Sequence, residues 1–144
     1  MFSKTCEYAI RAAVYIAKQA LEEKRVSLVD IAKQIGSPEA FTAKILQDLV
    51  RHNIVNSMKG PSGGFGIDNS RLSKIKLSHI VQAIDGDSIY KGCGLGLPEC
   101  SEKEPCPVHE KFKVIRSELR MMLEKTSLFE LASGLEKGLT VLKR

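Results

Sequence analysis

Three cysteines lie close together in one glycine- and proline-rich segment, spaced as Cys93-x6-Cys100-x5-Cys106. Thiolates are soft ligands that select zinc or iron–sulfur clusters, and glycines leave backbone N–H groups free to donate to sulfur. Zinc sites usually contain a C-x2–4-C pair, so the wider spacing here favours a cluster. His109 follows Cys106 by three residues and is a candidate fourth ligand.

Other chemistries fit the same segment. The thiols could form a redox disulfide pair or be inert, and His109 could be a surface residue at a helix start. A zinc loop for protein interaction and a thiol oxidoreductase using Cys100 and Cys106 are further alternatives. The chain has no C-x-x-C motif and no strand–helix alternation, so we predict that it is not an enzyme. Cys6 lies on an apolar helical stripe and is interpreted as a small buried hydrophobe.

The cysteine segment, residues 92–107, contains three Gly and three Pro and cannot form a regular element. A short helix over 77–84 precedes it. A long helix over 108–124 follows it, and then a last helix from 128 to about 142, which a capping box of Ser127 and Glu130 is expected to open. The long helix carries an apolar stripe of Phe112, Ile115, Leu119, Met122 and Leu123. Because the small first-half core cannot cover so long a stripe, we predict a dimerisation helix; the alternative is that it folds back on its own domain.

The first half has the pattern of a helix-turn-helix with a wing. Helices are expected over 3–23, from about 27 to 35 and from 38 to about 52, with strands at 54–58 and 65–67. Ser3, Ser27 and Ser37 are the expected N-caps, and Gly36 ends the second helix. The predicted fold class is therefore mainly α with a small β-hairpin wing: a winged helix-turn-helix domain plus a long dimerisation helix.

The third helix and the wing carry side chains suited to double-stranded DNA. Three polar residues of the helix can reach base edges or phosphates: Ser37, Thr42 and Gln47. Three basic residues can pair with phosphates: Lys44 and Arg51 on the helix and Lys59 on the wing. The wing adds Ser62 and Gly63 as candidate contacts. Glycines at a wing tip allow a close approach to the phosphate backbone. Each polar residue taken alone is equally compatible with a plain solvent-facing surface.

The distribution of charge supports this assignment. The 144 residues have a net charge of +5, and residues 1–76 contain 12 Lys+Arg against 7 Asp+Glu, whereas residues 77–144 contain 10 of each. The excess positive charge lies wholly in the half predicted to bind DNA. We divide the chain into a DNA-binding domain (1–76), a short helix with a cluster-binding loop (77–107), and the dimerisation and C-terminal helices (108–144). No run of about 18 apolar residues occurs, so no membrane association is expected and the predicted location is cytoplasmic.

These motifs together resemble those of the IscR/NsrR-type transcriptional regulators of the Rrf2 superfamily over nearly the whole chain. The resemblance rests on the three spaced cysteines and on residues 8–12 (YAIRA), 27–32 (SLVDIA), 43–49 (AKILQDL) and 60–65 (GPSGGF). The wing signature combined with the cysteine triplet is specific. Ser62 interrupts the run of wing glycines, and the first cysteine gap is longer than in some IscR-like members.

The resemblance implies a cytoplasmic homodimer that binds DNA and whose operator affinity is controlled by an iron–sulfur cluster held by Cys93, Cys100 and Cys106. IscR-like members use a His just after the last Cys on a 2Fe–2S cluster, a place that His109 occupies. NsrR-like members use an acid near the N-terminus of the partner subunit on a 4Fe–4S cluster, which would be Glu7 of the partner subunit. We favour His109 and 2Fe–2S over 4Fe–4S. Some relatives sense with thiols or small molecules alone, so a cluster-free regulator is the alternative.

Overall fold

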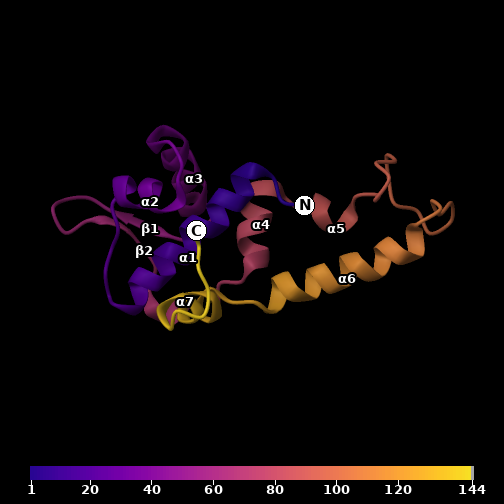
Figure 1. Ribbon diagram of the computed structural model, residues 1–144. Helices are drawn as coiled ribbons and strands as arrows, with labels where there is room; N and C mark the ends of the chain where they lie inside the picture. The colour runs from indigo at the N-terminus through magenta and orange to yellow at the C-terminus, as the bar shows by residue number, and fades with distance from the viewer. Residues whose placement is uncertain (144) are drawn as a thin grey trace.

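The computed structural model describes residues 1–143, which form a mainly helical molecule with one two-stranded antiparallel hairpin, as predicted (Figure 1). The elements are α1 (Lys4–Leu21), α2 (Leu28–Ile35), α3 (Glu39–Arg51), β1 (Asn56–Met58), β2 (Gly64–Gly66), a 3-10 helix (Asn69–Arg71), α4 (Leu77–Asp85), α5 (Ser88–Lys91), α6 (His109–Lys125) and α7 (Leu128–Glu136).

Helix α1 is the centre of the helical body and contacts α2, α3, α4 and α7. Five of its buried residues are alanines, at positions 9, 12, 13, 17 and 20, and their small side chains allow neighbouring helices to approach on several sides. The helix begins as predicted, because the hydroxyl oxygen of Ser3 accepts a hydrogen bond from the Cys6 backbone N–H at 3.0 Å. An N-cap of this kind typically contributes about 1 kcal/mol to stability.

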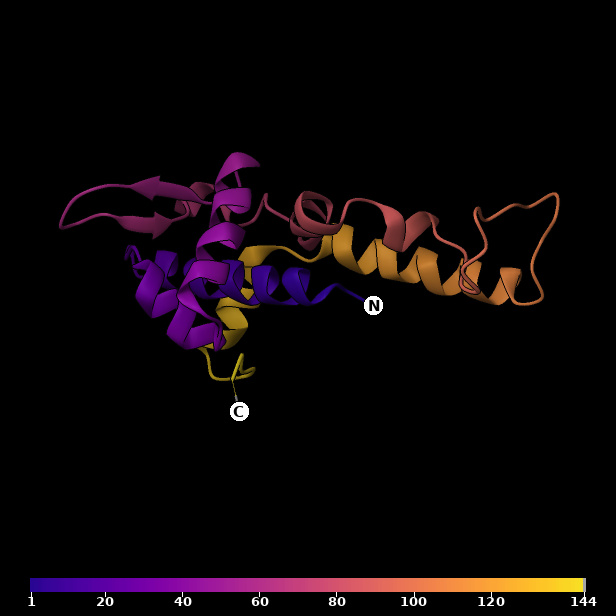
Figure 2. The same ribbon diagram turned by 90° about the horizontal axis from the view of Figure 1, so that it is seen from above.

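The helix-turn-helix and its wing follow the predicted order. Ser27 caps α2 by accepting from the Asp30 N–H at 3.2 Å, and Gly36 ends α2 in the left-handed conformation (φ 67°). The hairpin pairs Asn56 with Gly66 and Met58 with Gly64. The first strand is shorter than predicted and the second begins one residue earlier, and both project from the helical body as a narrow wing (Figure 2).

Helices α6 and α7 are consecutive in the chain but lie in different parts of the molecule. Helix α7 returns to pack against α1, and a β-bridge between Lys76 and Ser127 joins the starts of α4 and α7. Ser127 caps α7 by accepting from the Glu130 N–H, as predicted. The predicted extension of α7 to residue 142 is wrong: the helix ends at Glu136, because Gly138 turns the chain with φ 70°.

Helix α6 instead extends away from the body and carries residues 92–107 at its far end, opposite the wing (Figures 1 and 2). This segment contains no helix or strand, as predicted, but the short α5 just before it was missed. Within residues 1–143, none of the helices combines the length and apolar character needed to cross a bilayer.

Candidate nucleic-acid interface and cysteine loop

One side of α3 is open to solvent and polar. Lys44, Gln47 and Arg51 are all exposed, and their spacings of three and four residues place them on one side of the helix. Arg51 contacts the Asp48 carboxylate at 3.2 Å, but such an exposed pair is weak and leaves the guanidinium free to exchange partners. Three of the five predicted α3 contacts are therefore accessible to a duplex.

The other two predicted α3 residues do not face outward. Thr42 is fully buried, and its hydroxyl donates to the Pro38 carbonyl at 2.9 Å. The Ser37 hydroxyl oxygen is also buried, without a hydrogen-bond partner among residues 1–143. The prediction that Ser37 caps α3 is wrong, because Pro38 occupies the N-cap position and makes no side-chain cap. Neither hydroxyl can reach a base edge in this conformation.

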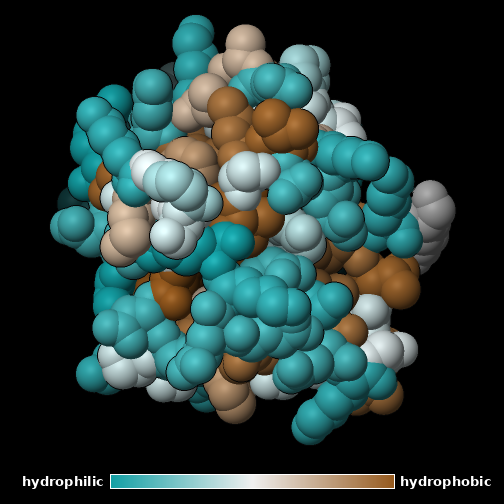
Figure 3. Space-filling view, turned by 90° about the vertical axis from the view of Figure 1, so that its left-hand side faces the viewer, coloured by the Kyte–Doolittle hydropathy of each residue, from teal (hydrophilic) through white to brown (hydrophobic). Residues whose placement is uncertain are grey.

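The tip of the wing exposes Lys59 and Ser62, while Gly63 is half-buried. A Cβ atom at Gly63 would lie 2.2 Å from the Met58 carbonyl oxygen. Glycine at 63 is thus required by the backbone of the wing itself, whatever approaches it from outside. Seen from the wing end, the surface is mainly hydrophilic, with hydrophobic patches between the polar groups (Figure 3).

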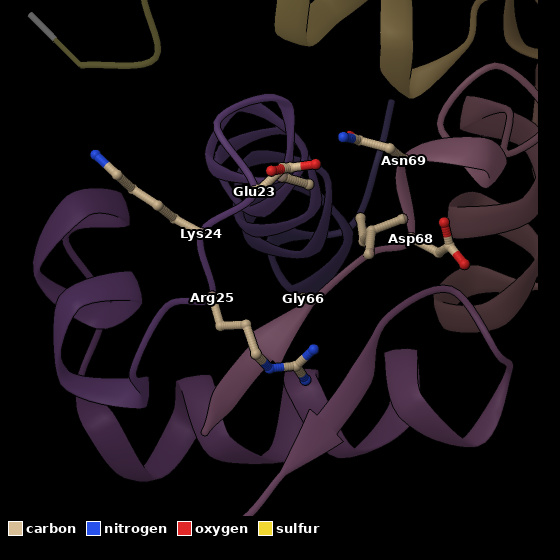
Figure 4. Close-up of a pocket in the computed structure, with 8 residues that line it drawn as sticks. Glu23, Lys24, Arg25, Gly66, Asp68 and Asn69 are labelled. Atoms are coloured by element: carbon tan, nitrogen blue, oxygen red, sulfur yellow. The ribbon is translucent and has the colours of Figure 1, made fainter. Parts of the chain in front are cut away.

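Arg25, which the sequence did not single out, holds the wing to the body. Its Nη2 donates to the Gly64 carbonyl at 2.8 Å and to the Asn56 carbonyl at 3.1 Å, and so contacts both strands. The side chain extends onto the hairpin, whereas the neighbouring Lys24 points away (Figure 4). The guanidinium donates to several acceptors at once, so it fixes the angle of the wing.

We expect Arg25→Gln to weaken DNA binding by about tenfold, because the hydrogen bonds from the guanidinium to Asn56 and Gly64, each worth about 1 kcal/mol, no longer hold the wing. Hydrogen exchange should rise at residues 56–66 while the unfolding temperature changes little. Lys24→Gln is the matched control, since it removes the same charge one residue away. Equal DNA affinities of the two variants would show that wing anchoring does not matter.

The cysteine loop, residues 92–107, brings its candidate ligands together as two pairs. The Cys106 side chain lies near that of Cys93, close enough to help lower the pKa of the Cys93 thiol. Cys100 Sγ lies 3.4 Å from His109 Nδ1 at the start of α6. Backbone N–H groups of Leu95 and Leu97 donate to Cys93 sulfur and lower the pKa of this thiol from its usual value.

Two features of the loop suit a metal centre. His109 is only 4% exposed, and its Nε2 has no hydrogen-bond partner in the described part of the chain. Gly94 lies against the ring of Phe112, where a Cβ would stand 2.5 Å from a ring carbon, so glycine lets the loop pack closely on α6. A buried imidazole nitrogen without a partner and sulfur surrounded by amide donors are the chemistry that an iron–sulfur cluster needs.

The donor types therefore fit a cluster, but the pairs are separate. Among residues 1–143, no three His, Cys, Asp or Glu side chains are close enough to share one metal ion. A cluster held by all four residues requires the Cys93–Cys106 pair and the Cys100–His109 pair to approach each other. The loop that joins them is irregular and rich in glycine, which permits such a movement.

Two further residues considered in the sequence, Cys6 and Glu7, lie on α1. Cys6 is fully buried as predicted, and burial, aided by the Asp85 carboxylate, raises the pKa of its thiol to about 12. It is therefore a core residue. Glu7 is exposed and contacts Lys4 Nζ at 3.2 Å. Its proposed role toward the cluster of a second chain stays a prediction.

The apolar residues of α6 lie on two different sides of the helix. Leu123 is buried and Phe112 and Leu119 are half-buried on the side facing α4 and α5. Ile115 and Met122 were predicted to share that side but are 57% and 47% exposed. With Val114 and Met121 they form an apolar exposed surface, called here the α6 outer face.

Comparison with known proteins gives a consistent result. The Rrf2 family, described as iron-dependent transcriptional regulators, matches residues 2–134. A protein of Aquifex aeolicus described as an HTH-type transcriptional regulator is 32% identical over 146 residues, covering 100% of this chain and 99% of that protein. The HTH-type transcriptional regulator IscR of Photorhabdus laumondii is 25% identical, covering 90% of this chain and 77% of that protein. The structure of CymR, the global cysteine regulator of B. subtilis, is 24% identical with a TM-score of 0.75, and the match covers 92% and 96% of the two chains.

Proposed function

The chain belongs to the Rrf2 family of transcriptional regulators, and on that basis we propose that it is a homodimeric DNA-binding regulator whose operator affinity is set by an iron–sulfur cluster on the cysteine loop. The main observation in support of this proposal is that the cysteine loop is in contact with α6. Phe112 and His109 of α6 contact Gly94 and Cys100 of the loop.

The DNA-binding end consists of the exposed side chains of α3 and the wing. Gln47 is the candidate base reader, because an amide can donate and accept at a base edge. Lys44, Arg51 and Lys59 are the candidate phosphate contacts, and Ser62 lies with Lys59 at the wing tip. A single module of this size buries about 600–1,000 Å² of its own surface on DNA, so two copies are needed for a long operator.

Lys59 gives a direct test of the wing contact. We expect Lys59→Ala to weaken binding about evenly across DNA sequences and to lower the slope of log affinity against log salt by about 1 for each protomer, because one phosphate contact is lost. Lys111→Ala, which removes the same charge at the far end of the molecule, should leave the slope unchanged. A slope that does not change in Lys59→Ala would remove the wing from the interface.

The second copy is proposed to sit on the α6 outer face. Four apolar side chains there are about half exposed, and α6 extends beyond the body that could otherwise cover them (Figure 1). Exposed apolar surface of this kind on a soluble helix typically marks an interface. Two α6 helices packed together would place a helix-turn-helix on each side of a symmetry axis.

Cys93, Cys100, Cys106 and His109 are the residues proposed to hold the cluster, with 2Fe–2S favoured. When bound, the cluster supplies thiolate-ligated iron that is vulnerable to oxygen, peroxide, nitric oxide and changes in cluster supply. Parts of the chain would then move on gain, loss or reaction of the cluster. The four ligands would draw together or separate, and the loop would reorder on α6. The spacing of the two α3 helices in the dimer would change as a result.

The arrangement of the cysteines also supports a second candidate function. Because the side chain of Cys106 is close enough to that of Cys93 to affect its ionisation, a regulator of the same fold could sense oxidants through this dithiol alone. Anaerobic purification followed by absorbance, iron and acid-labile sulfide measurements separates the two candidates. Iron and sulfide in equal amounts support the cluster. Zinc, or no metal with a Cys93–Cys106 disulfide formed by peroxide, would contradict it.

A further inference from the structure

One side of α6 carries three cationic side chains that contact the segment leading into and through the cysteine loop. Lys113 pairs with the Glu102 carboxylate. Arg116 donates through Nη1 to the Gly92 carbonyl at 2.6 Å and through Nη2 to Cys100 Sγ at 3.0 Å. Arg120 lies over the Tyr90 ring of α5, 4.8 Å from its centroid. These cations are spaced by three and four residues along the helix. Lys113 and Arg116 hold the loop to α6, whereas Arg120 holds α5.

Arg116 differs from the other two because it reaches sulfur. It lines a cavity of about 480 Å³ together with Tyr90, Lys91, Cys100 and His109. Lys91 and Lys113 also line this cavity, but each contacts a carboxylate, Asp87 and Glu102 respectively. The guanidinium is a permanent cation with donors only, so its contact with Cys100 is a hydrogen bond given to sulfur.

We propose that Arg116 is a positioning residue for the iron–sulfur site: it fixes Cys100 at the base of the loop and donates a hydrogen bond to its sulfur. The inference rests on the proposed function, in which Cys100 is a ligand. A sulfur bound to iron keeps lone pairs that can accept such a bond. Hydrogen bonds to cluster sulfurs are one of the factors that set the reduction potential, and a positive donor stabilises the more negative, reduced state.

The fork of the guanidinium is essential to this role. One nitrogen holds the backbone at the first residue of the loop while the other holds sulfur eight residues later. A lysine ammonium is a single point on a flexible stem and does not reproduce the planar two-pronged geometry. Arg116→Lys therefore keeps the positive charge but loses the simultaneous hold on Gly92 and Cys100. This variant distinguishes the effect of charge from the effect of positioning.

The test compares wild type, Arg116→Gln, Arg116→Lys and the control Arg120→Gln. Anaerobic reconstitution is followed by iron and sulfide counts, a redox titration and the rate of colour loss in air. We expect both Arg116→Gln and Arg116→Lys to have a more negative reduction potential than wild type. The expected shift is at least about 59 mV, which for a one-electron couple is a tenfold change in the ratio of reduced to oxidised cluster. Both should also lose colour several-fold faster, and Arg120→Gln should match wild type.

A second measurement needs no cluster. Hydrogen exchange on the metal-free full-length proteins should show faster exchange at residues 92–100 in both Arg116 variants and unchanged exchange there in Arg120→Gln. If wild type takes up no iron and sulfide, the proposed function fails while this measurement still tests the anchoring by Arg116. Unchanged potential and unchanged loop exchange in Arg116→Gln would overturn the inference. Full recovery of the wild-type potential by Arg116→Lys would overturn the claim that positioning, rather than charge, is the role of Arg116.

Discussion

We expect the Cys100→Ala variant to lose its iron–sulfur cluster completely, with no visible absorbance and no stoichiometric iron or sulfide after anaerobic reconstitution. The Cys100 sulfur stands in contact with both His109 and Arg116, so the substitution removes a thiolate ligand and leaves two polar groups without their partner. Even outer-shell substitutions at metal sites commonly cost 10–100-fold in affinity, and loss of a ligand costs more.

Cys6→Ala is the matched control for this experiment. Its thiol is fully buried in the helical body, and its pKa, raised to about 12, keeps it protonated. Removing one buried sulfur there should lower the free energy of unfolding by about 1 kcal/mol without changing the iron content. A Cys100→Ala protein with the full complement of iron and sulfide would show that the ligand set is wrong.

The second large effect concerns the α6 outer face. We expect Ile115→Glu combined with Met122→Glu to convert a dimer into a monomer, because two buried carboxylates would face their symmetry mates across an apolar interface. Operator affinity should then fall by about 10²–10⁴-fold, the range that a linked second binding module commonly contributes. Light scattering and DNA titration of the same samples measure both effects.

Gln82→Glu provides the control for added negative charge, since Gln82 is exposed on α4, outside the α6 outer face. This variant should remain dimeric and bind DNA nearly as wild type does. If Ile115→Glu with Met122→Glu stays dimeric, the two copies meet elsewhere.

The regular elements were predictable because their signals are local. Helix caps at Ser3, Ser27 and Ser127 and the stop at Gly36 depend on residues within one turn, and the structure confirms them. The four-residue α5 was missed because it is too short to show a helical period. The end of α7 was misplaced because the apolar pattern continues beyond Gly138, although the chain turns there.

The error at Thr42 has a different origin. Thr42 shares its helical side with Ile45, Leu46 and Leu49, at spacings of three, four and seven residues, and all four are buried. Helical phase therefore predicts burial, whereas residue type alone suggested a DNA contact. Threonine is tolerated there because its hydroxyl donates to the carbonyl four residues earlier.

Long-range contacts could not be predicted from one sequence. Arg25 reaches a carbonyl 39 residues away and Arg116 reaches a sulfur 16 residues away, and neither lies in a recognisable motif. The cysteine spacing indicated that the candidate ligands share one loop, but not that they stand as two pairs. That pairing depends on how the loop folds against α6.

The most direct test of control by the cysteine loop is to measure the affinity of one preparation for one duplex with and without the cluster. A duplex selected from a random pool by the wild-type protein would be titrated anaerobically by fluorescence anisotropy, first with the reconstituted protein and then after chelation of its iron. A coupling free energy of about 1–3 kcal/mol predicts a change in Kd of about 5–150-fold between the two states. Superimposable binding curves, with the cluster verified by its absorbance in one sample and its absence in the other, would contradict the account.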